Sequence, residues 1–197
     1  MNILIVHSHP GKKSYTSQVL EKLYNELKGS NCDVVISDLY SLNFKTDMTE
    51  QEYERESSTN SEVPLADDVK SEQAKLEWAD CVIFLYPVWW NDCPAKLKGW
   101  FDRVFTVGYA YKQVDFLPRM KTIKYGLVLC TAGYSNEFLN DTGIAQSMRT
   151  IMLDDRLGKR FEHKEMIILG DTLNLDEVRQ KHAEEITQAI NKMKAYR

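Results

Sequence analysis

Two adjacent indole side chains, Trp89 and Trp90, follow an apolar run that ends at Pro87. Pro87 fixes the direction in which the chain leaves this run, and Asn91 adds a polar group directly after the two rings. A planar heterocycle needs apolar contact for its face and N–H or C=O partners for its edge. This pattern favours a loop that binds a flat ligand, with filling of the core by the two rings as the open alternative.

A second loop has the character of an anion site. Ser14, Thr16 and Ser17 supply hydroxyl groups at the start of an expected helix, whose first N–H groups point toward the loop before it. Lys12 and Lys13 add positive charge, so that a phosphate there would receive backbone, hydroxyl and charge-assisted hydrogen bonds. The alternative is ordinary helix chemistry, because Ser14 is also a typical N-cap and exposed lysines are usually solvated.

Small residues form a third loop after another apolar run. Thr131, Ala132 and Gly133 leave the backbone bare, so that its N–H groups can approach the edge of a ligand closely. An ordinary turn is the alternative for these residues taken alone. Together, the three loops are suited to a phosphate, a ring and the edge of that ring, which favours one binding site over three unrelated turns.

Composition and motifs exclude several other classes of protein. The formal net charge of −4 does not favour binding of DNA or RNA, because nucleic acids are themselves negatively charged. The sequence contains neither G-x-G-x-x-G nor G-x-x-x-x-G-K-[ST], the fingerprints of dinucleotide and nucleoside-triphosphate loops. Its four cysteines show no C-x-x-C spacing, so we expect neither a disulfide framework nor a metal site.

The same features predict where the protein resides. The N-terminus lacks the basic leader of a signal peptide, and the longest apolar stretch, residues 81–90, is too short to span a bilayer. Cysteines at apolar positions, such as Cys81 and Cys130, are expected to be buried thiols. We therefore expect a cytoplasmic protein without an integral membrane segment.

Hydrophobic patterns outline the elements that must position these loops. Short apolar runs predict five strands, at residues 2–7, 32–40, 81–86, 124–131 and 165–170. Apolar residues at helical spacing predict helices between and after them, at residues 14–29, 63–79, 94–105 and 175–193. Between residues 43 and 62 the composition becomes polar and acidic, and we expect a surface excursion with one helical turn.

Strands that alternate with helices predict a parallel sheet with right-handed crossovers. Five such units fit a single domain, residues 1–197, with an α/β fold: a flavodoxin-like, doubly wound, five-stranded parallel sheet with helices on both faces. In this arrangement ligands bind beyond the carboxyl ends of the strands. The three loops follow the first, third and fourth strands, so we expect them to lie together.

The sequence resembles the NAD(P)H dehydrogenase (quinone) family of flavodoxin-like flavoproteins over most of its length. The most specific match starts at Pro87 and reads P-V-W-W-N-D-C-P-A-K-L-K-G-W-F-D-R-V-F, followed shortly by G-Y-A-Y. A second match is V-H-S-H-P-G-K-K-S-Y-T-S-Q-V-L, in which His9 lies five residues before Ser14. The segments S-D-L-Y and T-A-G also fit the family pattern.

The resemblance implies roles for individual residues. The flavin phosphate and ribityl chain would be held by His9, Ser14, Tyr15 and Thr16. The isoalloxazine ring would be bordered by Pro87, Val88, Trp89, Trp90 and Asn91. Its pyrimidine edge would be met by Thr131, Ala132, Gly133 and Tyr134. The candidates for the substrate pocket are Trp90, Tyr111 and Tyr134, with Tyr111 facing a flavin in the other subunit of a homodimer.

The resemblance also implies a reaction. The hypothesis is a flavin-dependent NAD(P)H:acceptor oxidoreductase in which the nicotinamide passes a hydride to the flavin and leaves. A quinone or similar small molecule then takes its place and accepts two electrons, in ping-pong order. FMN is favoured over FAD, because the chain is shorter than the members of the family that use FAD.

One departure from the family keeps a second function open. Animal quinone reductases carry a Tyr and a His as a proton relay, where this sequence has Phe138 or Leu139 and Ala145. The alternative is therefore a flavin-binding regulatory or ancillary subunit of a potassium-efflux system. The sequence does not choose between NADH and NADPH.

Overall fold

The computed structural model describes residues 1–111 and 118–196. At its centre lies a sheet of five parallel strands in the order β2-β1-β3-β4-β5. The strands are β1 (Asn2–His7), β2 (Asp33–Asp38), β3 (Cys81–Pro87), β4 (Ile123–Thr131) and β5 (Phe161–Leu169). This order confirms the flavodoxin-like doubly wound sheet expected from the sequence.

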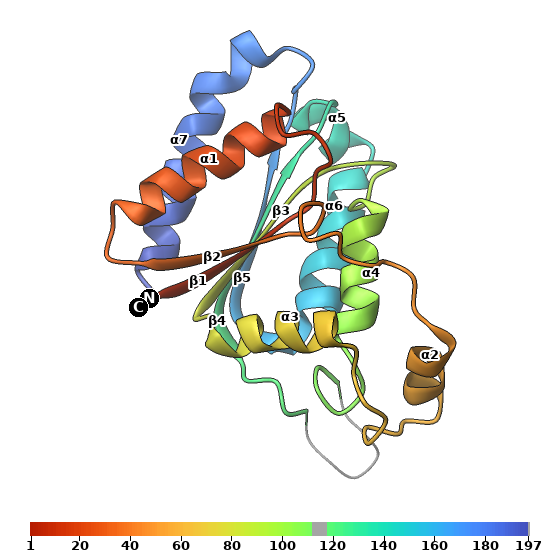
Figure 1. Cartoon of the computed structure of the whole chain (residues 1–197). Coiled ribbons are helices and arrows are strands. Elements are labelled where there is room, and N and C mark those ends of the chain that lie inside the picture. The colour runs from red at the N-terminus through yellow and green to blue at the C-terminus, as the bar shows by residue number, and fades with distance from the viewer. Residues whose placement is uncertain (112–117, 197) are drawn as a thin grey trace.

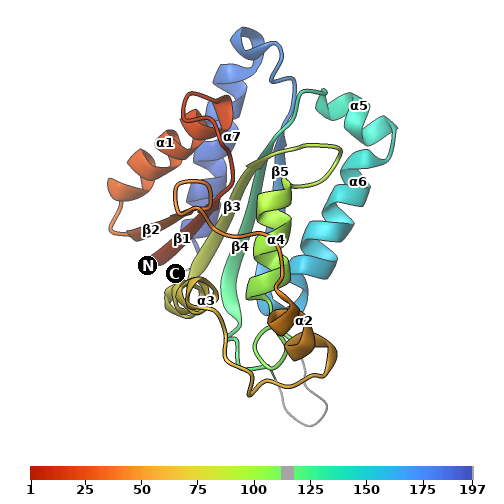
Figure 2. The same cartoon turned by 45° about the vertical axis from the view of Figure 1, so that its right-hand side comes forward.

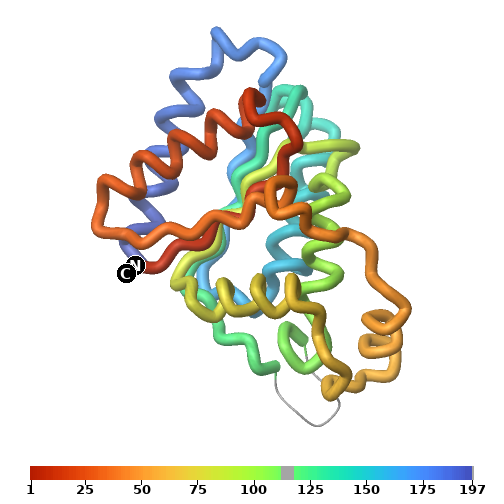
Figure 3. Tube along the Cα trace, viewed as in Figure 1, coloured from red at the N-terminus to blue at the C-terminus, as the bar shows by residue number. Residues whose placement is uncertain are grey.

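Helices cover both faces of this sheet (Figures 1 and 2). One face carries α1 (Tyr15–Lys28) and α7 (Leu175–Lys194). The other carries α3 (Asp67–Trp78), α4 (Ala95–Val104), α6 (Ile144–Arg149) and its π-helical continuation η1 (Thr150–Leu157). Shorter helices belong to the connections: α2 (Glu50–Ser57), α5 (Asn136–Asp141) and η2 (Gly158–Arg160). The N-terminus and the end of α7 lie close together (Figure 3).

Each inner strand buries side chains on both faces of the sheet. Ile3 and Ile5 of β1 belong to the apolar cluster under α1 and α7, whereas Leu4 and Val6 belong to the cluster under α3 and α4. All residues of β3, 81–87, are buried. This two-sided burial explains why the strands read as continuous apolar runs. Within residues 1–111 and 118–196, no helix combines the length and apolar character needed to cross a membrane.

Helix α4 turns its predicted apolar face to the sheet. Leu97, Trp100, Phe101 and Val104 are buried. The rings of Trp100 and Phe101 meet edge to face at 5.2 Å between centroids, and both pack on Phe84 of β3. The loop that leads from β3 into α4 therefore starts and ends on fixed elements.

Two stretches differ from the prediction. Helix α3 begins at Asp67 rather than at residue 63, because Pro64 favours an extended residue before it and an acidic residue favours the helix start. Residues 136–157, for which no element was predicted, form α5, α6 and η1. The wide turns of a π-helix move apolar residues away from the 3.6-residue spacing, which hides such a segment from pattern analysis.

The acidic excursion, residues 43–62, packs more closely than predicted. It contains α2, an eight-residue helix whose first turn is fixed by a capping box between Thr49 and Glu52. Arg55 of this helix is 1% exposed and donates a hydrogen bond to the Val107 carbonyl oxygen. Most residues of the excursion are exposed, as expected, but its helix is longer than the one predicted turn, and the buried Arg55 guanidinium holds it to the chain after α4.

Gly99 of α4 allows the excursion to lie directly on the helix, because a Cβ atom there would stand 2.5 Å from the Thr46 carbonyl oxygen. We predict that Gly99→Ala lowers the free energy of unfolding by about 1–3 kcal/mol, measured by chemical denaturation. The control is Gly29→Ala, whose Cβ would be 3.6 Å from the nearest backbone oxygen. We expect the control to change stability by less than about 0.5 kcal/mol. Equal losses in the two variants would contradict the close packing.

Candidate active site

The carboxyl ends of β1, β3 and β4 lead into loops that contact one another. The Val88 N–H donates to the Thr131 carbonyl oxygen at 2.8 Å, which joins the loop after β3 to the end of β4. The Thr16 and Thr131 hydroxyl oxygens are 2.8 Å apart. The His9 and Trp89 rings are 6.1 Å apart between centroids. The structure therefore brings together the three loops singled out in the sequence.

The tryptophan pair lies on a tight turn rather than in the core. Trp89 and Asp92 exchange two backbone hydrogen bonds, of 3.0 and 3.1 Å. Between them, Trp90 and Asn91 have positive φ angles of 50° and 62°. Trp90 is 100% exposed and Trp89 is 43% exposed, so the core-filling alternative is wrong for both rings. A bulky residue in the left-handed region is rare, and such strain clusters at ligand-binding positions.

A cavity of about 490 Å³ opens beside this turn. The residues that line it are Val88, Trp90, Asn91, Ala132, Gly133, Tyr134, Leu139 and Leu173. Most of these side chains are apolar, as a pocket for a planar ring requires. Leu173 was not assigned from the sequence, yet it is 84% exposed and its side chain approaches Gly133. Its place in the loop after the fifth predicted strand was the signal that could have identified it.

The hydroxyl groups of the loop after β1 are largely engaged with local partners. Ser14 caps α1 by accepting the Ser17 N–H at 3.1 Å. The Ser17 hydroxyl donates to the Gly11 carbonyl oxygen. The N–H groups of Tyr15 and Thr16 precede the first intrahelical hydrogen bond of α1. An anion at this helix start would therefore meet backbone N–H groups more than serine hydroxyls.

The Tyr15 side chain contacts α7. Its hydroxyl lies 2.9 Å from Nδ1 of the buried His182. The Arg179 guanidinium lies over its ring at 5.6 Å. The side chain that the resemblance assigns to the cofactor thus packs two helices together, and the backbone of Tyr15 is the part left to meet a ligand.

His9 offers a polar group that a ligand could use, whereas the neighbouring Ser8 is buried. The His9 Nδ1 accepts the Gly11 N–H at 2.8 Å, which leaves the proton of the neutral ring on Nε2 as a donor. Burial lowers the pKa of His9, which favours this neutral form. The Ser8 hydroxyl is buried without a hydrogen-bond partner in the described part of the chain. Sequence reasoning did not single out Ser8, and at 0% exposure its hydroxyl is covered by neighbouring protein atoms.

The loop after β4 offers fewer backbone donors than expected. Ala132 donates its N–H to the end of β5, and its carbonyl oxygen accepts from both the N–H and the hydroxyl of Thr172. Gly133 and Tyr134 are exposed and remain the candidates for the edge of a ligand. The Tyr134 ring stacks on Phe138 at 4.6 Å between centroids, which places an aromatic pair at the rim of the cavity.

Tyr111 does not join this cluster within one chain. The ten residues of α4 span about 15 Å and run back along the sheet, from the carboxyl ends of the strands toward their amino ends (Figure 1). There Tyr111 is 41% exposed, and its hydroxyl donates to the Glu56 carboxylate. Within one subunit Tyr111 therefore lies away from Trp90 and Tyr134, and its place in a pocket shared with the other subunit of a homodimer stays a prediction.

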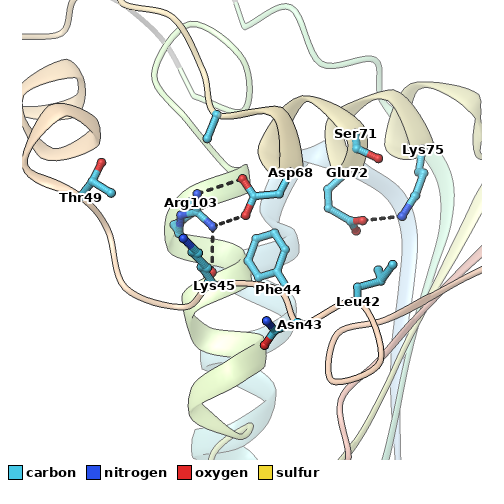
Figure 4. Close-up of a pocket in the computed structure, with 11 residues that line it drawn as sticks. Leu42, Asn43, Phe44, Lys45, Thr49, Asp68, Ser71, Glu72, Lys75 and Arg103 are labelled. Carbon is cyan, nitrogen blue, oxygen red and sulfur yellow. Dashed lines mark hydrogen bonds and ion pairs between the residues drawn. The ribbon is translucent and has the colours of Figure 1, made fainter.

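A second cavity, of about 420 Å³, lies between α3, α4 and the start of the excursion (Figure 4). Four of its five charged side chains pair with one another, since Arg103 contacts Asp68 at 2.6 Å and Lys75 contacts Glu72, and the fifth is that of the exposed Lys45. The Arg103 guanidinium also lies over the Phe44 ring at 5.1 Å. These contacts hold the excursion against α3 and α4, and the four paired side chains have their charges already matched within the protein.

Comparisons with known proteins extend this geometry. The sequence matches a protein family described by its flavodoxin-like fold, over residues 1–195. The solved NAD(P)H:quinone oxidoreductase from Methanothermobacter marburgensis is 42% identical, with a TM-score of 0.89 over 96% of this chain and 94% of that chain. NAD(P)H dehydrogenase [quinone] 1 of Rattus norvegicus is 35% identical over 163 residues, which are 76% of this chain. An FMN-dependent NADH-azoreductase from Bacillus anthracis, solved with FMN, shares the fold at 16% identity and a TM-score of 0.71, over 98% of this chain and 99% of that chain.

The matches differ in how much of each relative they cover. This chain spans 60% of the length of the rat protein, whereas it matches nearly the whole of the archaeal one. None of the three relatives is named as a subunit of a potassium-efflux system, so that alternative finds no support. The match over residues 1–195, together with 42% identity to a quinone oxidoreductase, shows that the chain belongs to the NAD(P)H dehydrogenase (quinone) family of flavodoxin-like proteins.

Proposed function

We propose that this chain is an FMN-dependent oxidoreductase that passes two electrons from NAD(P)H to a quinone. The observation that carries the proposal is the exposed turn of Trp89 and Trp90, where Trp90 lines an apolar cavity. Thr16, near the start of α1, contacts Thr131, the residue before Ala132 of the cavity lining. A tricyclic ring with a phosphate tail needs this combination of an apolar slot and helix N–H groups. The names of the relatives support the same assignment.

The loop after β1 would hold the phosphate and the ribityl chain. The N–H groups of Tyr15 and Thr16 suit phosphate oxygens, and Lys12 and Lys13 add positive charge beside them. The His9 Nε2 proton is a further donor, because Nδ1 is already occupied. The helix start thus supplies both the dipole and the hydrogen bonds that an anionic tail requires.

The cavity beside the tryptophan turn would receive the isoalloxazine ring. Its borders would be Pro87, Val88, Trp89, Trp90 and Asn91. Gly133 and Tyr134 would meet the pyrimidine edge with backbone N–H groups, which stabilise negative charge there. Leu173 would cover the ring from the loop after β5.

When bound, FMN supplies the redox chemistry, which is hydride acceptance from NAD(P)H and two-electron transfer to a quinone. The protein would orient the flavin and the substrates and would place an apolar surface beside the flavin ring. Trp90 and Tyr134 would line the one place that the nicotinamide and the quinone occupy in turn. A shared place of this kind enforces ping-pong order, because the oxidised nicotinamide must leave before the quinone enters.

A homodimer would complete the substrate pocket. Tyr111 is half-exposed and follows α4, away from the cavity beside Trp90 of its own subunit, and its hydroxyl donates a hydrogen bond to the Glu56 carboxylate. A second copy of the chain could present this side chain to the cavity beside Trp90. We propose that each pocket is built from two subunits in this way.

A cytoplasmic location stays a prediction. The thiols of Cys81, Cys93 and Cys130 are buried, and burial raises the pKa of Cys81 and of Cys93 to about 12. Thiols of this kind act as small apolar groups and are compatible with a reducing compartment.

The first test is turnover. We expect the chain, loaded with FMN, to lose its 450 nm flavin absorbance within seconds of adding NADPH or NADH and to regain it on adding menadione, as measured by stopped-flow absorbance (the wavelength and times are roughly those of flavoenzymes in general). Mass determination of the cofactor released by heat from the purified protein distinguishes FMN from FAD. A chain that retains no flavin, or a bound flavin that bleaches only over hours, would contradict the proposal.

The second test concerns the phosphate. Charge reversal at Lys12 and Lys13 together should weaken FMN roughly tenfold and leave riboflavin nearly unaffected, because only FMN carries the phosphate. Fluorescence titration of the ligand-free chain measures both affinities. Reversal of Lys192 and Lys194, at the far end of α7, is the matched control and should change neither. Equal losses for FMN and riboflavin would show that the phosphate binds elsewhere.

A further inference from the structure

The turn that carries Trp90 has a strained shape that its own side chains do not explain. Trp90 and Asn91 both lie in the left-handed region, which is unfavourable for a residue as bulky as tryptophan. Trp90 is 100% exposed, so contacts of its indole do not hold it there. A group outside positions 90 and 91 must therefore fix the turn.

A buried arginine from a distant part of the chain fixes the far end of this turn. Arg156 Nη1 donates to Asp92 Oδ1 at 2.7 Å, and Nη2 donates to Oδ2 at 2.9 Å. Such a two-point fork sets the orientation of a carboxylate as well as its position. Asp92 also exchanges both backbone hydrogen bonds with Trp89, and its carboxylate accepts the Cys93 N–H at 2.7 Å.

Arg156 is held on several sides. It belongs to the π-helical η1 and is 8% exposed. Its guanidinium lies over the Phe101 ring at 5.4 Å and within 3.1 Å of the Met152 sulfur. Burial alone would raise the pKa of the Asp92 carboxyl, but the hydrogen bonds from the Arg156 guanidinium hold this pKa below its ordinary value. The fork therefore ties the turn to the packed face of α4, and the ion pair stays charged in mildly acidic solution.

We infer that Arg156 is a positioning residue for the cofactor, which acts through Asp92 to preset the turn beside which the flavin ring binds. The inference rests on the proposed function, since it concerns flavin binding. A preset turn reduces the ordering that binding would otherwise require, and so favours tight binding of the ring. The motif from Pro87 does not identify Arg156, which lies 64 residues after Asp92.

The test measures FMN and riboflavin binding to the ligand-free full chain by flavin fluorescence, together with thermal unfolding. The matched control for Arg156→Met is Arg160→Met. Arg160 follows in the adjoining helix η2 and lies over the Phe105 ring at 5.2 Å. Its guanidinium donates to the backbone carbonyl oxygens of Ala110, Asp155 and Arg156, rather than to the turn, so the control also reports on loss of support for the backbone of η1. Both substitutions remove a guanidinium from the same region, so they separate loss of the turn from general loss of packing.

We expect Arg156→Met to weaken FMN and riboflavin by the same factor, roughly tenfold or more, because the turn borders the ring and not the phosphate. Asp92→Asn should have the same effect, and the double variant should be no weaker than either single variant. Arg156→Lys keeps the charge but not the fork and should lie between Arg156→Met and the parent. Arg160→Met should keep the parental affinity.

Three outcomes would overturn the inference while leaving the proposed function intact. The first is parental affinity in Arg156→Met and Asp92→Asn. The second is a loss of affinity in both Arg156→Met and Arg160→Met that follows a lower melting temperature. The third is a larger loss for FMN than for riboflavin, which would assign Arg156 to the phosphate. If the parent chain binds neither FMN nor riboflavin, the proposed function fails, and the inference fails with it.

Discussion

Thr131, the last residue of β4, joins the loops from which the site is built. It pairs with Pro87 in the register of β3 and β4. Its carbonyl oxygen accepts the N–H of Val88, the residue after the proline, and its hydroxyl lies beside that of Thr16 at the start of α1. Thr131 thus contacts the chain where it leaves β3 and the start of the helix that follows β1, and it is itself the point at which the chain leaves β4. A slip of one residue between β3 and β4 would turn this hydroxyl to the other face and separate the loops.

Buried arginines hold the irregular segments on the α4 face of the sheet. Arg55, Arg103 and Arg156 are 1%, 4% and 8% exposed, and each reaches a group outside its own helix. Buried ion pairs add little net stability, yet loss of one partner is strongly destabilising. We interpret these three side chains as setting where the excursion and the tryptophan turn lie, whereas the apolar clusters on the two faces supply most of the stability.

Local patterns were sufficient to predict the parallel sheet, the Ser14 cap and the apolar face of α4. Each of these depends on residues within a few positions, and burial on both faces makes the strands legible as apolar runs. The meeting of the three loops also followed, because parallel strands end at one edge. Apart from Tyr111, the candidate residues therefore lie on loops that contact one another, even where a side chain such as that of Tyr15 turns elsewhere.

What could not be predicted depends on distant partners. The left-handed conformation of Trp90 is fixed through an arginine on a segment that pattern analysis left blank. The distance of Tyr111 from Trp90 and Tyr134 of the same subunit follows from the direction in which α4 runs, which spacing alone does not reveal. Whether the Ser8 hydroxyl has a hydrogen-bond partner depends on which segments surround it in three dimensions, and the described residues supply none.

The exposed apolar side chains at the rim of the cavity affect how the ligand-free protein interacts with other molecules. Trp90, Tyr134 and Leu173 are 100%, 60% and 84% exposed, so the ligand-free chain presents large apolar side chains to water. Surfaces of this kind adhere to other apolar surfaces, including those of chaperones and of further copies. A ligand that covers the rim removes this hazard and shifts the folding balance by mass action. Supply of that ligand, as well as synthesis of the chain, would then govern how much of the protein escapes degradation.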